Sequence, residues 1–259
     1  PNTTNRQIRA RQKFSFISWN VQNKSRSGLD AIFDLLESYT TPDVIALQET
    51  FMYAEQVTDT IGQYRLVVNE LCPSDCVIAL HRRWLGRIES IKFHPRAVLV
   101  WLRADHGCVL AISAHLRHSW AEDEIEADAL YAEELDQISA LIDAKPYDSL
   151  FAAVDANVEL SGAVWTTCGP FVTGAAVTAQ EWCFLEFAGR HRLTAANTLT
   201  LHSLPTHRPT GAGVLRPRQI DFVLTSFPAA AAKCRPDVQT ASDHSPIFLE
   251  IEERTAVVA

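Results

Sequence analysis

The stretch TASDHSPIFLEI, residues 240–251, places an acid, an imidazole and hydroxyls on a turn that leads directly into an apolar run. Pro246 ends the turn, and the run IFLEI behind it predicts a strand. A rigid strand would therefore hold Asp243 and His244 just before its first residue. Because such a short motif alone is also typical of an ordinary polar turn, its meaning depends on partners elsewhere in the chain.

Length and composition favour one globular domain with a sizeable core. The chain has 259 residues, of which 47% are hydrophobic and 21% are charged. No apolar run approaches the roughly 18 residues of a membrane-spanning helix, and the amino end lacks the apolar segment of a secretion signal. We expect an intracellular chain with no membrane association, with residues 1–13 as a flexible basic arm and residues 14–259 as a single domain.

The six cysteines indicate neither a disulfide framework nor a zinc site. Cys108 and Cys183 fall in apolar segments, where a reduced thiol behaves as a small hydrophobe. Cys72 and Cys76 have no second Cys or His pair at zinc-like spacing. We therefore expect reduced thiols in the core.

The net charge of −8 at first argues against a polyanionic partner. Nine of the acids, and no Lys or Arg, lie between residues 122 and 143, so the rest of the chain is close to neutral. Apolar residues from Ile125 to Ile142 recur there every three or four positions, which predicts a long helix with an acidic outer face. That face would not meet phosphates, but the remaining surface leaves a nucleic-acid partner open.

The chain opens with a strand, a helix and a strand. Residues 14–21 alternate as in a strand, residues 29–36 follow a helical period, and residues 44–49 form a short apolar run typical of a buried strand. Asn20 and Glu49 stand at the ends of the two strands, where ligands gather in layered α/β proteins. Taken alone, a turn residue and a helix cap are equally good interpretations of the two.

An antiparallel block of strands follows, and the last of its strands presents His115 from an apolar run. A satisfied core histidine is the alternative interpretation of that residue. The strands of this block are expected at 65–69, 76–81, 87–91, 97–103 and 108–115. Beyond the acidic helix we expect a strand at 149–154, a helix at 181–189, extended chain at 193–200, a surface loop at 201–218 and a strand at 219–225.

Five of the predicted strands end on, or carry, a polar residue that phosphoester hydrolysis requires. These residues are Asn20, Glu49, Asp155 with Asn157, Asp221, and Asp243 with His244. The ordered motifs WNV, LQET, VDAN, QIDFV and SDHSP resemble the endonuclease/exonuclease/phosphatase superfamily over roughly residues 14–251. The resemblance implies an α/β (α+β) fold, a four-layered α/β sandwich in which two mostly antiparallel β-sheets pack face to face between helices.

The resemblance also implies a phosphodiesterase that depends on Mg²⁺ or Mn²⁺. Glu49 would bind the cation, with Asn20 and Asp243 as further ligands, and hard oxygen ligands suit such an ion. The cation would relieve the charge on the phosphate and help to activate a water molecule.

The resemblance assigns the catalytic work to five residues. His244 would contact the scissile phosphate and be held by Asp221, a pairing that favours the cationic imidazole. Asp155 would orient or deprotonate the attacking water, and Asn157 would hydrogen-bond the water or a phosphate oxygen. His115 stands where the family has a Tyr or His near the phosphate.

Three more residues are expected to bind substrate. Thr206, in the motif PTH, matches a threonine that many members carry beside the site, and Asn197 opens the segment NTLTLHSLPTHRPTG. Arg208 on the same loop would meet a nucleic-acid backbone, although loop arginines are often only solvated. Val154 replaces the glycine that usually precedes the aspartate of the VDAN motif, so the backbone would approach substrate less closely there.

The branch of the superfamily is suggested by the segments around these motifs. The compact length, the basic arm, the HRRW run at residues 81–84 and the NTLTLHSLPTHRPTG segment look most like the endonuclease domain of a non-LTR retrotransposon. Such a domain nicks target DNA to leave a 3′ hydroxyl for reverse transcription, which implies a DNA partner, a nuclear location and a monomer without an obligate protein partner. The alternatives are an RNA exonuclease such as a deadenylase, a phosphatase of inositol compounds or lipids, and a catalytically silent binding module.

Overall fold

The computed structural model describes most of the chain from residue 13 to residue 252. The described residues are 13–22, 24, 26–51, 60–72, 75–105, 107–118, 124–161, 166–174, 177–200, 205–209, 216–227, 230, 232–238 and 242–252. Residues 1–12 of the predicted basic arm, and much of the predicted loop 201–218, lie outside them. Lys13, the last residue assigned to the arm, is the first residue of a strand and forms an ion pair with Glu250 at 2.6 Å.

In the part of the chain that the structure describes, one sheet has seven strands, and of its strand pairs only β1 with β2 is parallel. In spatial order its strands are β12 (Ala232–Cys234), β13 (Ile247–Glu252), β1 (Lys13–Asn20), β2 (Val44–Gln48), β5 (Cys76–His81), β4 (Tyr64–Val68) and β3 (Thr60–Ile61). The second sheet has six strands among the described residues, and of its named strand pairs only β8 with β9 is parallel. Its order is β10 (Thr194–Ala195), β11 (Asp221–Thr225), β9 (Ser149–Asp155), β8 (Gly107–His115), β7 (Ala97–Ala104) and β6 (Ile88–His94).

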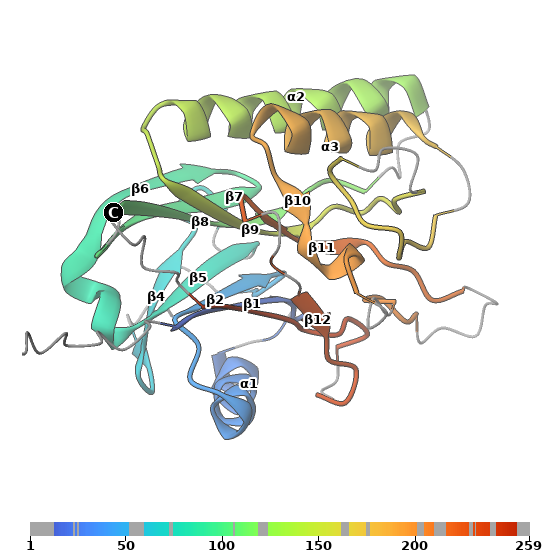
Figure 1. Ribbon diagram of the computed structural model, residues 1–259. Helices are drawn as coiled ribbons and strands as arrows, with labels where there is room; N and C mark the ends of the chain where they lie inside the picture. Colours follow the sequence, from blue (N-terminus) through green and yellow to red (C-terminus); the bar gives the residue numbers. More distant parts are fainter. Residues whose placement is uncertain are drawn as a thin grey trace, which may run out of the picture.

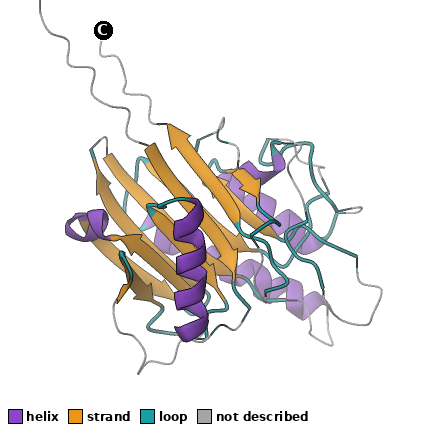
Figure 2. Cartoon of the chain, turned by 90° about the horizontal axis from the view of Figure 1, so that it is seen from below, coloured by secondary structure: helices purple, strands orange, loops and turns teal. Residues whose placement is uncertain are grey.

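The two sheets face each other, and helices cover their outer faces (Figure 1). Helix α1 (Arg26–Tyr39) lies across the seven-stranded sheet, which Figure 2 shows from the helix side. Helices α2 (Glu124–Asp143) and α3 (Ala179–Arg190) lie side by side over the six-stranded sheet. Two short 3₁₀ helices, η2 (Arg82–Arg87) and η3 (Ala196–Thr198), complete the described elements. The predicted four-layered sandwich is confirmed.

Three apolar clusters fill the three interfaces between the layers. Phe16 and Phe151 stack between the sheets with ring centroids 5.9 Å apart. Leu29 and Phe33 of α1 pack on the seven-stranded sheet, and Tyr131 of α2 packs on the six-stranded one. Burial of these side chains is the main stabilising contribution to the stacked layers.

The predicted stripe on the acidic helix is wrong in its first half. Ile125 is 81% exposed, whereas Tyr131, which the predicted stripe does not include, is buried. The tyrosine hydroxyl donates a hydrogen bond to the carbonyl of Ala156 at 2.9 Å, so its polar end is satisfied inside the core. From Leu135 to Ile142 every predicted position, Leu135, Ile138 and Ile142, is buried.

Other local predictions are refined by the structure. Residues 193–200 were expected to be extended, but only Thr194–Ala195 pairs as a strand before η3 begins. All six cysteines are free thiols, as expected, although Cys108 and Cys183 are only partly buried. No helix among the described residues is long and apolar enough to span a membrane.

Candidate active site

Strand pairing gathers the polar strand ends at one edge of the sandwich. The parallel pair β1 and β2 places Asn20 beside Gln48, so Glu49 follows at the same edge. In the other sheet the parallel pair β8 and β9 places His115 beside Asp155, and antiparallel β11 places Asp221 beside the same aspartate. Within each sheet the parallel strands end at a common edge, and the antiparallel strand β11 begins there, so residues far apart in the sequence lie together.

The SDHSP turn closes this edge from the seven-stranded sheet. Strand β13 runs antiparallel to β1 with Ile247 opposite Ser18, so the residues before Ile247 lie beyond the carboxyl end of β1. The Ser242 hydroxyl donates to the carbonyl of Asn20 at 2.9 Å, and the Trp19 indole N–H donates to the carbonyl of His244 at 3.0 Å. These contacts fix the turn against β1.

Asn20 is the centre of a small group of carboxylates. Its Nδ2 donates to Glu49 Oε1 at 2.8 Å and to Asp155 Oδ2 at 2.7 Å. Its Oδ1 accepts the backbone N–H of Gln22 at 2.9 Å, which fixes the orientation of the amide. Asn20 therefore presents its nitrogen to the carboxylates; to present its oxygen to a metal ion, the amide would have to turn and lose the bond to Gln22.

The group around Glu49 fits a hard dication. Glu49, His115 and Asp155 each offer one ligating atom within 4.8 Å of the others, and the Glu49 side chain is 26% exposed. Two carboxylates brought together at a partly open position suit Mg²⁺, which keeps several of its water ligands. Asp243, the third predicted ligand, lies instead in a group with His207 and His244.

His115 is held by an aspartate that the sequence reasoning missed. Its Nδ1 lies 2.5 Å from Asp75 Oδ1, and its Nε2 lies 3.7 Å from Glu49 Oε1. Burial alone lowers the pKa of His115, but the bond to Asp75 and the charges of Asp155, Asp75 and Glu49 outweigh it and raise the pKa to about 9. Asp75 directly precedes β5, whose antiparallel pairing with β2 places Cys76 opposite Gln48. That pairing was the signal that could have revealed Asp75.

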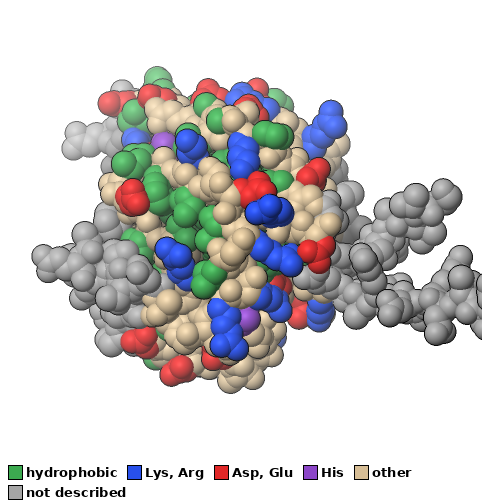
Figure 3. All heavy atoms as spheres, turned by 90° about the vertical axis from the view of Figure 1, so that its left-hand side faces the viewer, with side chains coloured by type: hydrophobic (Ala, Val, Ile, Leu, Met, Phe, Trp, Pro, Cys, Tyr) green, Lys and Arg blue, Asp and Glu red, His purple; other side chains and the backbone are tan. Residues whose placement is uncertain are grey.

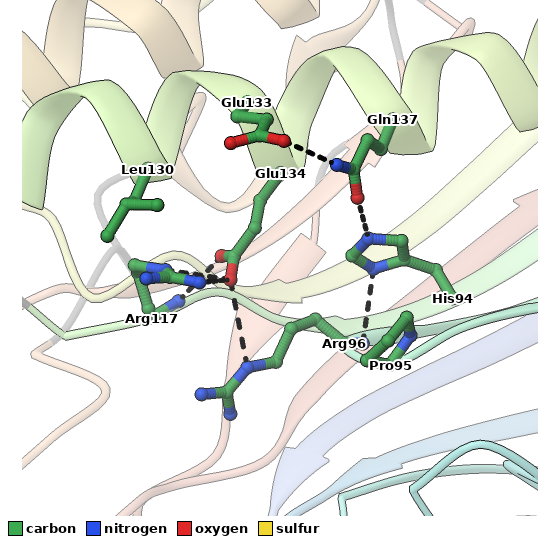
Figure 4. Close-up of a pocket in the computed structure, with 8 residues that line it drawn as sticks. All are labelled: His94, Pro95, Arg96, Arg117, Leu130, Glu133, Glu134 and Gln137. Atoms are coloured by element: carbon green, nitrogen blue, oxygen red, sulfur yellow. Dashed lines mark hydrogen bonds and ion pairs between the residues drawn. The ribbon is translucent and has the colours of Figure 1, made fainter.

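Behind Asp75, a chain of charges leads to helix α2 (Figure 4). Arg96 Nη1 lies 3.5 Å from Asp75 Oδ2, and Arg96 Nε lies 3.9 Å from the buried carboxylate of Glu134. The Glu134 carboxylate also accepts bonds from Arg117, at 2.8 Å from Nε and 3.2 Å from the backbone N–H. Arg96, Arg117 and Glu134 line a cavity of about 200 Å³ beside the end of β8, and both arginines stay partly exposed.

The predicted contact between Asp221 and His244 is confirmed. His244 Nδ1 lies 2.9 Å from Asp221 Oδ2 and 3.1 Å from Oδ1. Burial alone lowers the pKa of His244, but the charge of Asp221 and the bond to it raise the pKa to about 9. Burial alone raises the pKa of Asp221, and the charge of His244 lowers it below its usual value. The two residues thus form a buried ion pair.

Thr206 and Asn197, predicted to bind substrate, hold the Asp221 strand instead. Both are 0% exposed. The Thr206 hydroxyl accepts the backbone N–H groups of Ile220 and Asp221, each at 3.1 Å, and Asn197 Nδ2 donates to the carbonyl of Asp221 at 3.0 Å. Because these polar atoms already serve buried backbone groups, the two residues act through Asp221 rather than on a ligand.

Asp155 lies between the two histidines. Burial, and then the charge of Asp221, raise its pKa to about 6, against the lowering effect of His244 and His115. The Asn157 backbone N–H donates to Asp155 Oδ1 at 3.1 Å, and Asn157 Nδ2 donates to the carbonyl of Leu116 at 2.8 Å. Val154, in place of the usual glycine, points into the core under α2 and α3.

The cationic residues flagged in the sequence have different surroundings. Arg208 is exposed, and its backbone N–H donates to the carbonyl of Asp243 at 2.8 Å, so it borders the site. Arg216 forms an ion pair with Glu159 at 2.8 Å. The HRRW run begins at the far end of β5 from Asp75 and continues into η2, away from the gathered strand ends. Figure 3 views the molecule from that opposite end, where Lys and Arg lie among hydrophobic side chains.

Comparison with known proteins places this geometry in a wider context. A model of the Endonuclease/Exonuclease/phosphatase family matches residues 17–244. No curated protein sequence matches the chain.

Solved structures share the fold at low sequence identity. The endonuclease domain of TRAS1, a telomere-specific non-LTR retrotransposon, superposes with a TM-score of 0.63 at 14% identity, covering 93% of this chain and 100% of that one. The AP endonuclease LMAP from Leishmania major gives a TM-score of 0.67 at 15% identity, covering 94% and 89%. The 3′ phosphatase NExo from Neisseria, bound to a product DNA hairpin, gives 0.67 at 14% identity, covering 93% and 100%.

Proposed function

Because the chain belongs to the endonuclease/exonuclease/phosphatase family, hydrolases that act on phosphate esters, we propose that it is a Mg²⁺-dependent endonuclease that nicks DNA and leaves a 3′ hydroxyl. One observation carries the proposal. Glu49, His115, Asp155 and His244 converge from four strand ends, and Asn20 bonds two of them. All the parts that phosphodiester hydrolysis needs are thus within reach of one phosphate.

Glu49 holds the divalent cation in this proposal, and Asn20 orients its carboxylate. When bound, the cation supplies charge relief on the phosphate and lowers the pKa of a coordinated water. Asn20 also bonds Asp155, so a single amide sets the spacing between the metal-binding and the water-activating carboxylates.

Asp155 takes a proton from the attacking water. A pKa of about 6 keeps it ionised at neutral pH and close to the value at which a general base works best. Asn157 fixes one oxygen of this carboxylate through its backbone N–H. His244, held cationic by Asp221, donates to the phosphate oxygens as charge builds up on them.

DNA is the proposed substrate because cations border the site on two sides. Arg208 is exposed next to Asp243, while Arg96 and Arg117 are partly exposed beside His115. Arginines in these places suit the phosphates on either side of the scissile one. The likeness to the TRAS1 endonuclease domain and to a DNA-bound phosphatase supports this choice of substrate.

A plasmid-nicking assay tests the proposal. Supercoiled DNA should become open-circle in Mg²⁺ and stay intact in EDTA, and a DNA polymerase should extend the nick because its 3′ hydroxyl is free. Asp155→Asn should abolish nicking, whereas Asp136→Asn, which changes only an exposed ion pair with Arg190, should not. Nicking that persists in Asp155→Asn would show that Asp155 is not the group that takes the proton from water.

The same preparations decide between the branches of the family. Absence of nicking, together with release of nucleotides from poly(A), would make the protein an RNA exonuclease. Release of phosphate from inositol phosphates would make it a phosphatase. Inactivity on all of these substrates would indicate a binding module that keeps the fold but does not catalyse hydrolysis.

A further inference from the structure

A second group of ligating side chains lies next to the ion pair of Asp221 and His244. His207 Nε2 is 3.3 Å from Asp243 Oδ2, and His244 Nε2 is 3.6 Å from Asp243 Oδ1. The two imidazole rings are 4.6 Å apart, and one ligating atom from each of the three residues lies within 4.8 Å of the others. His207 has no part in the proposed hydrolysis.

The backbone holds these three residues in place. His207 and Arg218 exchange two backbone hydrogen bonds of 2.9 Å. On its other side the same segment pairs with the SDHSP turn, since the Arg208 N–H donates to the Asp243 carbonyl at 2.8 Å and the Ser245 N–H donates to the Thr206 carbonyl at 2.7 Å. The side chains therefore face one another before any ligand binds.

Asp243 has an oxygen that this arrangement leaves unsatisfied. Its side chain is 9% exposed, and Oδ1 is buried without a hydrogen-bond donor among the described residues. Oδ1 thus accepts no hydrogen bond although His244 Nε2 lies 3.6 Å away, and a metal ion between them would satisfy this oxygen directly. His244 binds Asp221 through Nδ1, so its Nε2 faces the group in the carboxylate–histidine–metal arrangement common in metal sites.

We propose that His207, Asp243 and His244 bind a divalent transition-metal ion such as Zn²⁺, at a site separate from Glu49. Bonds of about 2.1 Å in tetrahedral geometry place neighbouring ligand atoms roughly 3.4 Å apart. The Asp243 carboxylate lies 3.3 Å from His207 Nε2 through Oδ2 and 3.6 Å from His244 Nε2 through Oδ1, so both imidazoles lie near that spacing from the carboxylate. Two imidazoles and one carboxylate favour Zn²⁺ over Mg²⁺, which prefers oxygen ligands.

This site regulates the proposed activity, and this consequence rests on the proposed function. The ion displaces the proton of His244 Nε2 into solvent and occupies the nitrogen that faces the phosphate, so its binding should inhibit Mg²⁺-dependent nicking. Three protein ligands leave a fourth position for water or for a phosphate oxygen.

Binding is tested without reference to activity, with Co²⁺ as the probe and Mg²⁺ in excess. The intense visible absorption of tetrahedral Co²⁺ should appear, be displaced by Zn²⁺, remain in Glu49→Gln, and be lost in both His207→Asn and His207→Gln. No absorption in the wild type, or absorption in both His207 variants as strong as in the wild type, would overturn the site. Either result would say nothing against the nuclease proposal, which the plasmid assay decides separately.

Inhibition is tested by titrating Zn²⁺ into the Mg²⁺-supported nicking reaction. His207→Asn should nick as the wild type does without Zn²⁺, which also shows that it folds. It should need at least about tenfold more Zn²⁺ for half-inhibition, since even outer-shell changes cost 10–100-fold in metal affinity. His191→Gln, which alters a buried histidine bonded to Ser139, should keep wild-type sensitivity. Equal sensitivity of His207→Asn and the wild type would refute inhibition through this site.

Discussion

The edge of the sandwich carries two histidine–aspartate pairs that are built alike and supported differently. In each pair the aspartate meets Nδ1 of the histidine, and the pKa of the histidine rises to about 9. Asp75 also meets Arg96, and through it Glu134 of α2. Asp221 is instead held through its own backbone by Thr206 and Asn197.

The difference shows how the same pair can serve two purposes. The charge of Asp75 is shared between His115 and Arg96, and Nε2 of His115 faces Glu49, where the proposed cation supplies positive charge of its own. His244 has the full charge of Asp221 and lies with Asp155 and Asp221 in one group. We therefore expect the His244 pair to matter more for the chemistry and the His115 pair to matter more for placement.

The largest effect should separate the two histidines. His244→Ala should lower kcat for plasmid nicking by about 10³-fold, the upper range for loss of a donor to a developing oxyanion. His115→Ala should cost about tenfold less, because the cation at Glu49 partly replaces its charge. Single-turnover nicking at saturating Mg²⁺ measures both values. Equal losses would remove the distinction between the pairs.

The next effect is on stability and its dependence on pH. The raised pKa of His244 contributes stability that is complete below about 6.5 and is lost as pH rises through about 9. The lowered pKa of Asp221 contributes stability that is present above 3.8 and is lost as pH falls below it. Asp221→Asn should therefore cost about 3 kcal/mol of unfolding free energy near pH 6, and much less above pH 9. Urea unfolding in EDTA measures the difference, with Asp136→Asn as the control.

A smaller effect should separate the two aspartates in activity. Asp221→Asn should lower kcat by about 10- to 100-fold, as expected for loss of a charged hydrogen bond worth about 1.5–3 kcal/mol. Asp75→Asn should lower kcat by a smaller factor, because the charge of Asp75 is already partly balanced by Arg96. A larger loss in Asp75→Asn than in Asp221→Asn would reverse the assignment of roles.

The smallest effect concerns the support from α2. Glu134→Gln should lower kcat/KM by about fivefold, the scale of a coupling near 1 kcal/mol, by loosening Arg96 and Arg117. The adjacent Glu133→Gln is a matched control, because Glu133 is exposed and meets Gln137 on its own helix at 2.9 Å. If the two variants behave alike, the chain of charges in Figure 4 does not reach the site.

Local patterns in the sequence were enough to find most of the strands and helices and the polar strand ends, whereas the four layers were implied by the resemblance to a known family. Asn20, Glu49 and Asp155 each close a short apolar run, and a period of two or of 3.6 is a property of neighbouring residues. The pair of Asp221 and His244 was also predictable, although only through the resemblance of ordered motifs to a known family.

Only the tertiary structure decided what stands behind those residues. Asp75 reaches His115 across 40 positions, and the direction of the Asn20 amide depends on the local turn at Gln22. Thr206, which was predicted to contact substrate, instead supports β11 through its hydroxyl, and His207 lies beside Asp243. Strand register and burial determine such contacts, and both arise when distant segments pack together. A pattern of neighbouring residues therefore determines which side chains reach the edge, and the packed fold determines which of them touch.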